Sequence, residues 1–504
     1  MDRCKVFVLM AATALGCAMA ACQPGVPSTF SESGRQADLY PDVADVTVPV
    51  NIAPLTFQMD TTEVEEMVAR FSCGDKSFTC GGEKIQPDEA DWRSLASAAQ
   101  GGSITVDLYT RQGDQWQHHE PFQIHVSRDS IDPWLSYRLI SPSYVTYEDL
   151  TLNQRCLENY DERVMVDNML CGTEENGQCV NCHNYQKQNP GRMQFHARQF
   201  HGGTVTVYDG RIRKINMAND SLLSAGVYPT WHPELPLIVY STNKTAQTFH
   251  TSNLNKIEVY DAASDLIAYD VERNEATNIE NDPDEFECYP FWAPDGRTLY
   301  YCSAHFVVGD TSVVRDMEVI RRAKEVRYLL YKKSFSPETW TFGPRQLVFE
   351  HPDSMSATLP RVSPDGRWLM FTLGRYGVFH IWHHEADLYL MDLASGDVRP
   401  MTELNSPDTE SYHTWSSNGR WVVFSSRRDD SGYTRPFIAH IDANGKGTKP
   451  FELPQQDPAH NRLLMKSYNI PEFMRGPVEV SPQQFADVLK GEGEKVKYVG
   501  KLRR

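Results

Sequence analysis

Four hairpin-like segments recur in the second half of the chain, and they constrain its fold more than any other feature. They begin at positions 228, 289, 359 and 412 and read YPTWHPELPLIVYS, YPFWAPDGRTLYYCS, LPRVSPDGRWLMFTL and YHTWSSNGRWVVFSS. Each reads as a strand, a tight turn and a second strand, because the glycine in PDGR or SNGR accepts the positive φ that such a turn requires. A third strand such as ADLYLMD and a weaker fourth such as VRPMTE follow.

Units of four strands, spaced about 50 to 70 residues apart, are typical of a β-propeller, whose blades bury their faces by stacking around an axis. The segment GGTVTVYDGRIRKINM at 202–217 predicts the outer strands of one more blade. We therefore expect an all-β chain in which five blades are visible and six are present.

The remaining sequence divides by composition and by the period of its apolar residues. We predict a lipoprotein signal peptide at 1–21, a flexible tether at 22–39, a β-sandwich-like domain at 40–148, a helical segment at 149–201, the propeller at 202–456, and a C-terminal extension at 457–504. Within that extension, SPQQFADVLKG predicts a short helix, since Ser-Pro begins it and Gly ends it.

The N-terminus indicates export from the cytoplasm. Arg3 and Lys5 precede a short apolar stretch, and MAAC places small residues before Cys22. We predict cleavage before Cys22 and a lipid on its thiol, with a cut at Cys17 or a plain secreted protein as the alternatives. This prediction places the chain outside the cytoplasm, anchored to a membrane by its lipid.

The cysteines support an oxidising compartment. There are 11 cysteines. Two leave with the signal, Cys22 takes the lipid and two belong to the motif discussed below, so six remain, and an even remainder favours disulfides. By proximity in sequence, the candidate pairs are Cys73 with Cys80, Cys156 with Cys171, and Cys288 with Cys302. Free buried thiols are the alternative for each pair.

The pentapeptide CVNCH carries the sharpest chemical hypothesis. Cys179, Cys182 and His183 have the spacing with which a c-type haem is attached by two thioethers and ligated by the adjacent imidazole. Met193 is the first candidate for the distal iron ligand, His196 is the second, and a five-coordinate iron stays open. The alternatives are a metal site, which needs further ligands such as Cys171 or His196, and a redox or structural disulfide.

The turn-centred repeats resemble those of the TolB-type propeller family. Together with the signal, NCHNY, WHPELPLIVYSTNKTAQTFH and YGVFHIWHHEADLYLMDL, they are similar to TolB-like propeller lipoproteins with a single CxxCH, loosely labelled cytochrome c or cytochrome c biogenesis proteins. That resemblance implies a periplasm-facing envelope protein of a Gram-negative bacterium with one covalent haem c.

The function classes follow from these features. A net charge of −18 argues against nucleic acid as a partner, and no GxSxG, HExxH or phosphate-binding glycine loop assigns a catalytic residue. We predict an electron-transfer protein whose propeller docks a redox partner or another envelope protein. A binding scaffold for an envelope protein or glycan, with a structural CxxC, is the first alternative, and a haem-dependent peroxidase-like enzyme is the second.

The histidines of FHIWHHEADLY are expected to hydrogen-bond locally in a blade connection, with a metal-facing or haem-facing patch as the alternative.

Overall fold

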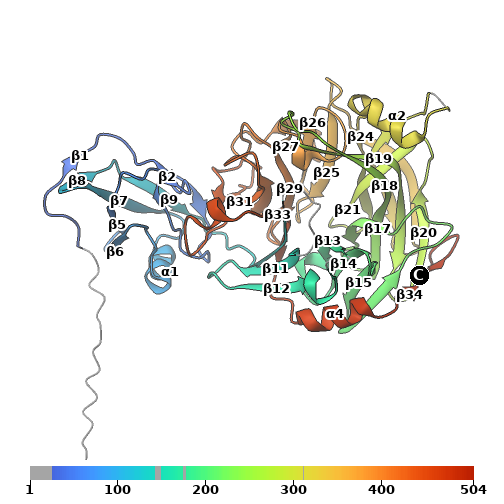
Figure 1. Cartoon of the computed structure of the whole chain (residues 1–504), viewed down its shortest axis with the longest axis horizontal. Helices are drawn as coiled ribbons and strands as arrows, with labels where there is room; N and C mark the ends of the chain where they lie inside the picture. Colours follow the sequence, from blue (N-terminus) through green and yellow to red (C-terminus); the bar gives the residue numbers. More distant parts are fainter. Residues whose placement is uncertain (1–24, 142–148, 174–176, 310–311, 504) are drawn as a thin grey trace, which may run out of the picture.

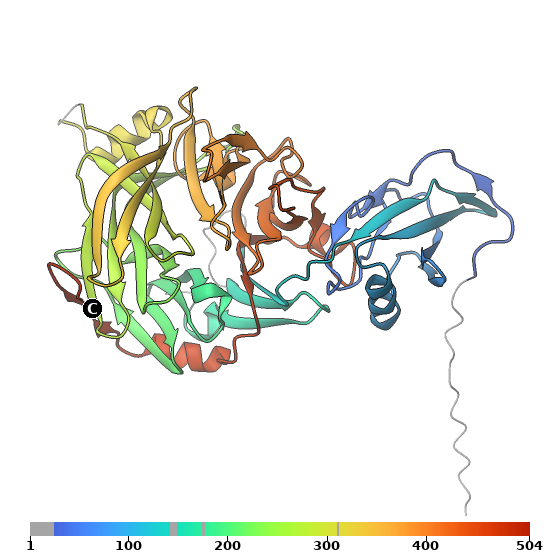
Figure 2. The ribbon, with the colours of Figure 1, turned by 180° about the vertical axis from the view of Figure 1, so that it is seen from behind.

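The computed structural model describes residues 25–141, 149–173, 177–309 and 312–503. A small domain at the N-terminal end of the chain lies beside a ring of β-sheets (Figures 1 and 2). The predicted signal peptide and Cys22 lie outside the described residues. No helix within those residues has the length and apolar character needed to cross a bilayer.

The four recurring segments form four antiparallel, four-stranded blades, which confirms the predicted propeller arrangement. The first blade consists of β17 (Gly226–Trp231), β18 (Leu237–Phe249), β19 (Ile257–Asp270) and β20 (Glu275–Glu280), and the second of β21 (Glu285–Trp292), β22 (Thr298–His305), β23 (Leu329–Ser336) and β24 (Thr341–Phe349). The third consists of β25 (Ser356–Val362), β26 (Trp368–Gly374), β27 (Asp387–Asp392) and β28 (Val398–Pro400). The fourth consists of β29 (Glu410–Trp415), β30 (Trp421–Ser426), β31 (Arg435–His440) and β32 (Phe451–Glu452). The turn glycines behave as predicted: Gly296, Gly366 and Gly419 have φ of 62°, 73° and 67°.

Two further sheets lie in the same ring. One has the order β12-β11-β10-β33 and the other the order β13-β14-β15-β16, with β34 added in parallel at its edge. Their strands are β10 (Trp134–Ile140), β11 (Thr151–Cys156), β12 (Glu162–Asp167) and β33 (Ser467–Met474); β13 (Gln178–Tyr185), β14 (Met193–Gln199), β15 (Gly203–Tyr208), β16 (Arg211–Asn216) and β34 (Glu494–Lys495). The outer strands predicted within 202–217 are β15 and β16, and β13 and β14 complete their sheet.

The predicted helical segment at 149–201 is wrong. Apart from two short 3₁₀ turns, Asn168–Leu170 and Gln186–Gln188, its regular elements are the strands β11 to β14. The apolar spacing misled because burial of Leu152 and Met165 in the core overrides local propensity. The CxxCH motif therefore lies on strand β13.

The predicted C-terminal extension is partly integrated into the ring. β33 pairs with β10 from Trp134↔Met474 to Ile140↔Ser467, so the two ends of the ring-forming chain meet in one sheet. The short helix is confirmed as α4 (Pro482–Lys490), where Ser481 and Gln484 form a capping box. α4 packs beneath the ring against β12 and β16 (Figure 1).

The N-terminal domain has one principal sheet where the sequence predicts a sandwich. Its strands are β1 (Ser31–Glu32), β3 (Thr47–Val48), β5 (Glu66–Cys73), β6 (Lys76–Gly82), β7 (Ser103–Gln112), β8 (Gln115–His118) and β9 (Phe122–Val126), accompanied by α1 (Glu89–Ala98) and the ribbon of β2 (Leu39–Tyr40) and β4 (Gln58–Met59). The predicted tether ends earlier than 39, because β1 pairs with β8. One hydrophobic core runs from Trp92 through Tyr137 to Trp421, so this domain is packed onto the ring.

The remaining elements are short. They are α2 (Arg315–Arg321), the 3₁₀ turns Ala323–Glu325 and His380–Trp382, α3 (His460–Leu463) and β35 (Lys497–Tyr498), which pairs with β20.

Candidate functional site

Six strands carry the same backbone irregularity. β13, β17, β21, β25, β29 and β33 each contain a register shift, and at each shift one residue other than glycine has φ between 45° and 55°. These residues are Cys182, Tyr228, Tyr289, Leu359, Tyr412 and Ile470. A bulge with positive φ is strained for such side chains, so its recurrence shows that the six strands occupy equivalent places. We call these strands the inner strands.

The inner strands surround a common channel. All six positive-φ residues line one narrow cavity of about 20 Å³. A first cavity of about 420 Å³ shares Cys182, Tyr228, Tyr412 and Ile470 with this constriction. A second cavity, also of about 420 Å³, shares Asn184, Arg361 and Glu472 with it. The channel thus consists of two ligand-sized cavities separated by a narrow constriction.

The CxxCH motif is part of this repeat. Cys182 is the positive-φ residue of its strand, as Tyr228 and Tyr289 are of theirs, and His183 is the residue that follows it. The residues that follow the bulge on the other five strands are Pro229, Pro290, Pro360, His413 and Pro471. The Cys-His pair therefore stands where the other inner strands have Tyr-Pro, Leu-Pro, Tyr-His or Ile-Pro.

The ring of His183 is packed inside the protein. It is 1% exposed, and among the described residues neither ring nitrogen has a hydrogen-bond partner. Burial, aided by Arg138, lowers its pKa to about 3, while the backbone of Ser136 and Ile470 faces the ring. The imidazole is therefore neutral and faces the constriction, which has no room for a porphyrin.

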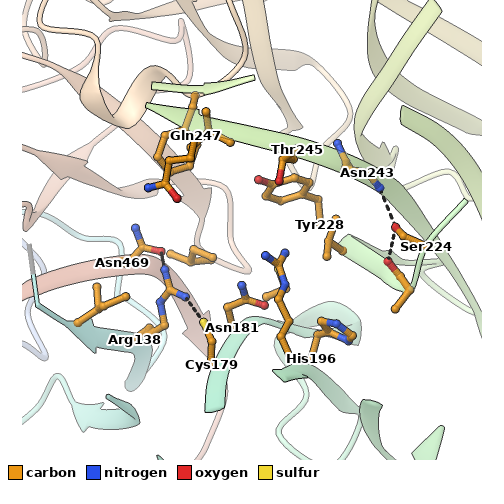
Figure 3. A pocket seen from close by; sticks show the side chains of 18 of the residues that line it. Arg138, Cys179, Asn181, His196, Ser224, Tyr228, Asn243, Thr245, Gln247 and Asn469 are labelled. Carbon is orange, nitrogen blue, oxygen red and sulfur yellow. Dashed lines mark hydrogen bonds between the residues drawn. The ribbon is translucent and has the colours of Figure 1, made fainter. Parts of the chain in front are cut away.

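The two thiols of the motif face the first cavity, whereas His183 faces the constriction. Cys179 and Cys182 both line the first cavity, and Arg138 Nη1 lies 4.0 Å from the sulfur of Cys179 (Figure 3). Burial raises the pKa of Cys182, although Arg198 and Arg138 oppose this shift. The thiols fit the two attachment points of a c-type haem, whereas the packed ring of His183 does not fit a proximal ligand.

The two candidates for the distal iron ligand lie on opposite faces of β14, because successive side chains of a strand alternate between its faces. Met193, Phe195 and Ala197 point from β14 into the core beneath α4, and Met193 is fully buried there. His196 points to the opposite face and lines the first cavity (Figure 3). Its Nδ1 lies 3.1 Å from Thr204 Oγ1, and burial lowers its pKa to about 3. Met193 therefore does not line the first cavity, and His196 is the imidazole that faces it.

The first cavity contains polar groups that the sequence analysis missed. Two arginines line it: Arg138, which donates to Asn469 Oδ1 over 3.0 Å, and Arg198, which is exposed and lies opposite Cys179 on β14. Amide and hydroxyl side chains complete the polar lining: Asn181, Ser224, Asn243, Thr245, Gln247 and Asn469 (Figure 3). None of the described residues that line this cavity is acidic.

The predicted disulfides are absent from the structure, which holds all eight described cysteines as free thiols. Cys73 lies opposite Lys76 and Cys80 opposite Ala69, so this pair is offset along the ladder. Cys156 is the last residue of β11. Cys171 lies near the first residue of that strand, because the backbone N–H of Asn168 donates to the carbonyl of Leu150. These two pairs are too far apart for a disulfide. Cys288 and Cys302 are direct cross-strand neighbours, so only this pair stays compatible with one.

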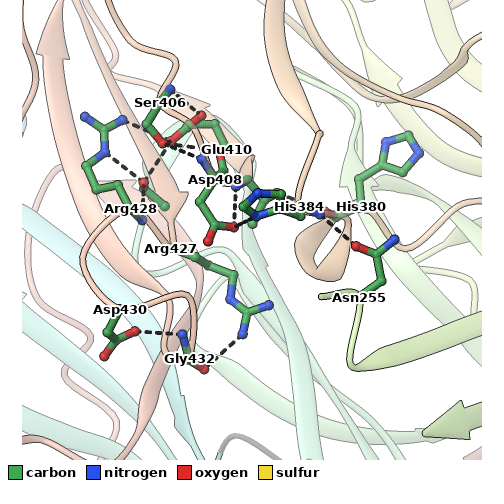
Figure 4. A network of polar contacts seen from close by, with 12 residues as sticks. Asn255, His380, His384, Ser406, Asp408, Glu410, Arg427, Arg428, Asp430 and Gly432 are labelled. Carbon is green, nitrogen blue, oxygen red and sulfur yellow. Dashed lines mark hydrogen bonds and ion pairs between the residues drawn. The ribbon is translucent and has the colours of Figure 1, made fainter. Parts of the chain in front are cut away.

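Of the histidines of 380–384, the side chains of His380 and His384 contact their own blade and the connection that follows it, whereas that of His383 bonds to Glu258 on β19 of another blade. His380 Nδ1 lies 2.9 Å from Thr358 Oγ1, and His384 Nδ1 lies 3.2 Å from Asp408 Oδ1 (Figure 4). Asp408 belongs to a network in which Glu410 accepts from Ser406 and Arg428. No group of three or more metal-ligating side chains occurs within the described ranges.

Comparisons with known proteins concern the fold alone. No known protein family and no curated protein matches the chain. Among solved structures, an oligogalacturonate lyase in complex with manganese matches at 12% identity over 68% of this chain and 86% of that one, with a TM-score of 0.31. The tricorn protease matches at 12% identity over 70% of this chain and 34% of that one (TM-score 0.35). The β-propeller domain of the Trilobed protease from Pyrococcus furiosus matches at 10% identity over 71% and 96% (TM-score 0.28).

Proposed function

We propose that this chain is a ligand-binding propeller protein of the cell envelope, and that the first cavity binds a small carboxylated sugar or the acidic end of a glycan. The observation that carries the proposal is the lining of that cavity. It combines Arg138 and Arg198 with amides and hydroxyls and has no acidic side chain among the described residues, although the chain as a whole carries a net charge of −18.

The chemistry of the lining suits such a ligand. Guanidinium groups recognise carboxylates through charge-assisted hydrogen bonds, while amides such as Asn181 and Gln247 can donate to and accept from hydroxyls. His196 is neutral, so its cavity-facing nitrogen adds a further polar contact without adding charge. Burial of Arg138 strengthens its electrostatic interaction with an anion, since less water screens the pair.

Titration calorimetry with D-glucuronate and D-glucose tests this proposal. We expect glucuronate to bind, glucose to bind more weakly, and Arg198→Gln to weaken glucuronate binding by about 10-fold to 100-fold, the value of a hydrogen bond to a charged group. Arg198 is exposed, so its replacement leaves the fold intact. Arg475→Gln, in the second cavity, is the matched control and should change nothing. Equal binding of the two sugars, or no effect of Arg198→Gln, would contradict the proposal.

The wider architecture belongs to the same proposal. We propose that the sheets of β10 and β13 are the fifth and sixth blades of a TolB-like propeller, because their inner strands repeat the bulge of the other four. A lipid on Cys22 would anchor this propeller to the membrane.

A second candidate function is electron transfer through one covalent haem c, and the joint exposure of Cys179 and Cys182 to one cavity favours it. The two arginines would then face the propionates, and a redox partner protein would dock at the mouth of the cavity. His183 would have to leave its packed position before it could serve as a ligand.

A pyridine haemochrome spectrum separates the two functions. The protein is made with a c-type maturation system and extracted with acidic acetone before measurement. A retained α band that Cys179→Ser/Cys182→Ser abolishes would establish the haem, and it would assign the first cavity to that group. A colourless protein with both thiols intact is what the packing of His183 predicts.

A further inference from the structure

The second cavity lies at the opposite end of the channel from the thiols. Each inner strand contributes to it the residues two, three and five places after its positive-φ residue. The third place is aromatic on five of the six strands: Tyr185, Trp231, Trp292, Trp415 and Phe473, with Val362 on the sixth. The cavity is therefore a ring of aromatic walls around the channel axis, with a volume of about 420 Å³.

The residue two places after the positive-φ residue differs in charge between the strands. On β25 it is Arg361 and on β33 it is Glu472, and both residues line the cavity and the constriction beneath it. β29 contributes Thr414 at the same place. Arg361 and Glu472 thus face the same enclosed space from different strands. Lys187 and Arg475 also line it, but Lys187 pairs with Glu234 and Arg475 is exposed.

These two charges are not paired with each other. Within the described residues, neither Arg361 nor Glu472 forms an ion pair at 4 Å or less, although each charge affects the pKa of the other. Arg361 lies over the ring of Phe291 at 4.9 Å, and Glu472 accepts a hydrogen bond from Asn184 over 3.3 Å. Burial raises the pKa of Glu472 to about 7, although Arg361 lowers it.

Buried charges of opposite sign are normally paired, because each alone loses its hydration. A ligand that carries both charges would satisfy both side chains at once. We propose that the second cavity is a binding site for a small zwitterion, an α-amino acid with an apolar side chain, with Arg361 on its carboxylate, Glu472 on its ammonium group and the aromatic ring around its side chain.

L-phenylalanine and two analogues test this assignment by calorimetry and by the fluorescence of the tryptophans that line the cavity. N-acetyl-L-phenylalanine lacks the ammonium group, and L-phenylalaninamide lacks the carboxylate. We expect L-phenylalanine to bind to the full chain and each analogue to bind at least about tenfold more weakly, since each leaves one buried charge without its partner.

Two variants assign the contacts. Glu472→Gln should remove the preference for L-phenylalanine over the N-acetyl analogue, and Arg361→Gln should remove the preference over the amide. Arg198→Gln, in the first cavity, is the control and should leave both preferences unchanged. If Arg361→Gln fails to fold, the analogues on the unmodified protein still decide the matter.

Two outcomes would overturn the proposal. One is that L-phenylalanine and L-leucine both fail to bind at up to about 10 mM. The other is that both analogues bind as well as the amino acid. Neither outcome bears on the first cavity, so failure here leaves the proposed binding of acidic sugars standing.

Discussion

A chain that ends before β33 is expected not to fold into a stable monomer. β33 pairs with β10 along its length, and its side chains Tyr468 and Phe473 are buried in the core that joins the ring to the N-terminal domain. Without β33, the edge of β10 and the apolar faces of Leu135 and Tyr137 are exposed, and an exposed apolar edge promotes aggregation. Size-exclusion chromatography and thermal unfolding by circular dichroism measure this loss.

A truncation after residue 490 is the matched control, because it keeps β33 and α4 and removes only β34, β35 and the residues that follow them. We expect that variant to stay monomeric and to melt cooperatively. Phe473→Ala offers a milder version of the same test, and we expect it to lower the free energy of unfolding by about 3–5 kcal/mol. A monomer that melts at the unmodified temperature without β33 would show that the ring does not depend on this closure.

The replacement His383→Leu is expected to destabilise the protein by about 3–5 kcal/mol near neutral pH, because it leaves a buried carboxylate without its cation. His383 is fully buried, and its Nε2 lies 3.0 Å from Glu258 Oε2. Its Nδ1 lies 3.7 Å from Glu385 Oε1. Burial alone would lower the pKa of His383, but the carboxylates of Glu258 and Glu385 outweigh it and raise the pKa to about 9.

The pH dependence of this effect has a definite sign. Because the pKa in the folded state lies above the unfolded value of about 6.5, the stabilisation is fully present below about pH 6.5 and disappears as the pH rises through about 9. The difference in unfolding free energy between the unmodified protein and His383→Leu should therefore shrink over that interval. Denaturant unfolding at several pH values measures it.

His305→Leu is the control for this prediction. His305 Nδ1 lies 3.1 Å from Glu285 Oε1, a similar distance, but 68% of the His305 side chain is exposed. Solvent screening limits such a pair to about 0–1 kcal/mol. If both variants lost the same stability, burial of the His383 pair would not be the source of its effect.

Local sequence patterns predicted the hairpins and one helix correctly. The turns at Gly296, Gly366 and Gly419 need positive φ, and the PDGR and SNGR sequences supply it within four residues. α4 begins at a capping box and ends at Gly491 for equally local reasons. Features of this kind depend on neighbours along the chain, so a single sequence contains the information needed to find them.

The segment 149–201 shows where such reasoning stops. Its CHNY reads as the end of a haem motif and as one more copy of the Tyr-Pro-Thr-Trp repeat, and NPGR at 189–192 resembles the SNGR turn. Aligning CHNYQKQNPGRMQF with YHTWSSNGRWVVF was the available signal that would have placed this segment on an inner strand. The histidine in place of proline, and the long connection between the strands, concealed it.

The sequence by itself determined that this chain forms turn-linked β-hairpins, repeats them, and carries a strong acidic charge, because these properties depend on composition and on contacts within a few residues. Only the tertiary structure decided that Cys179, Cys182 and His196 share a cavity with Arg138 while His183 and Met193 do not. It also decided that Arg361 and Glu472 face one enclosed space. These placements depend on the bulges that turn six inner strands toward one axis, and those strands are separated by up to about 290 residues along the chain.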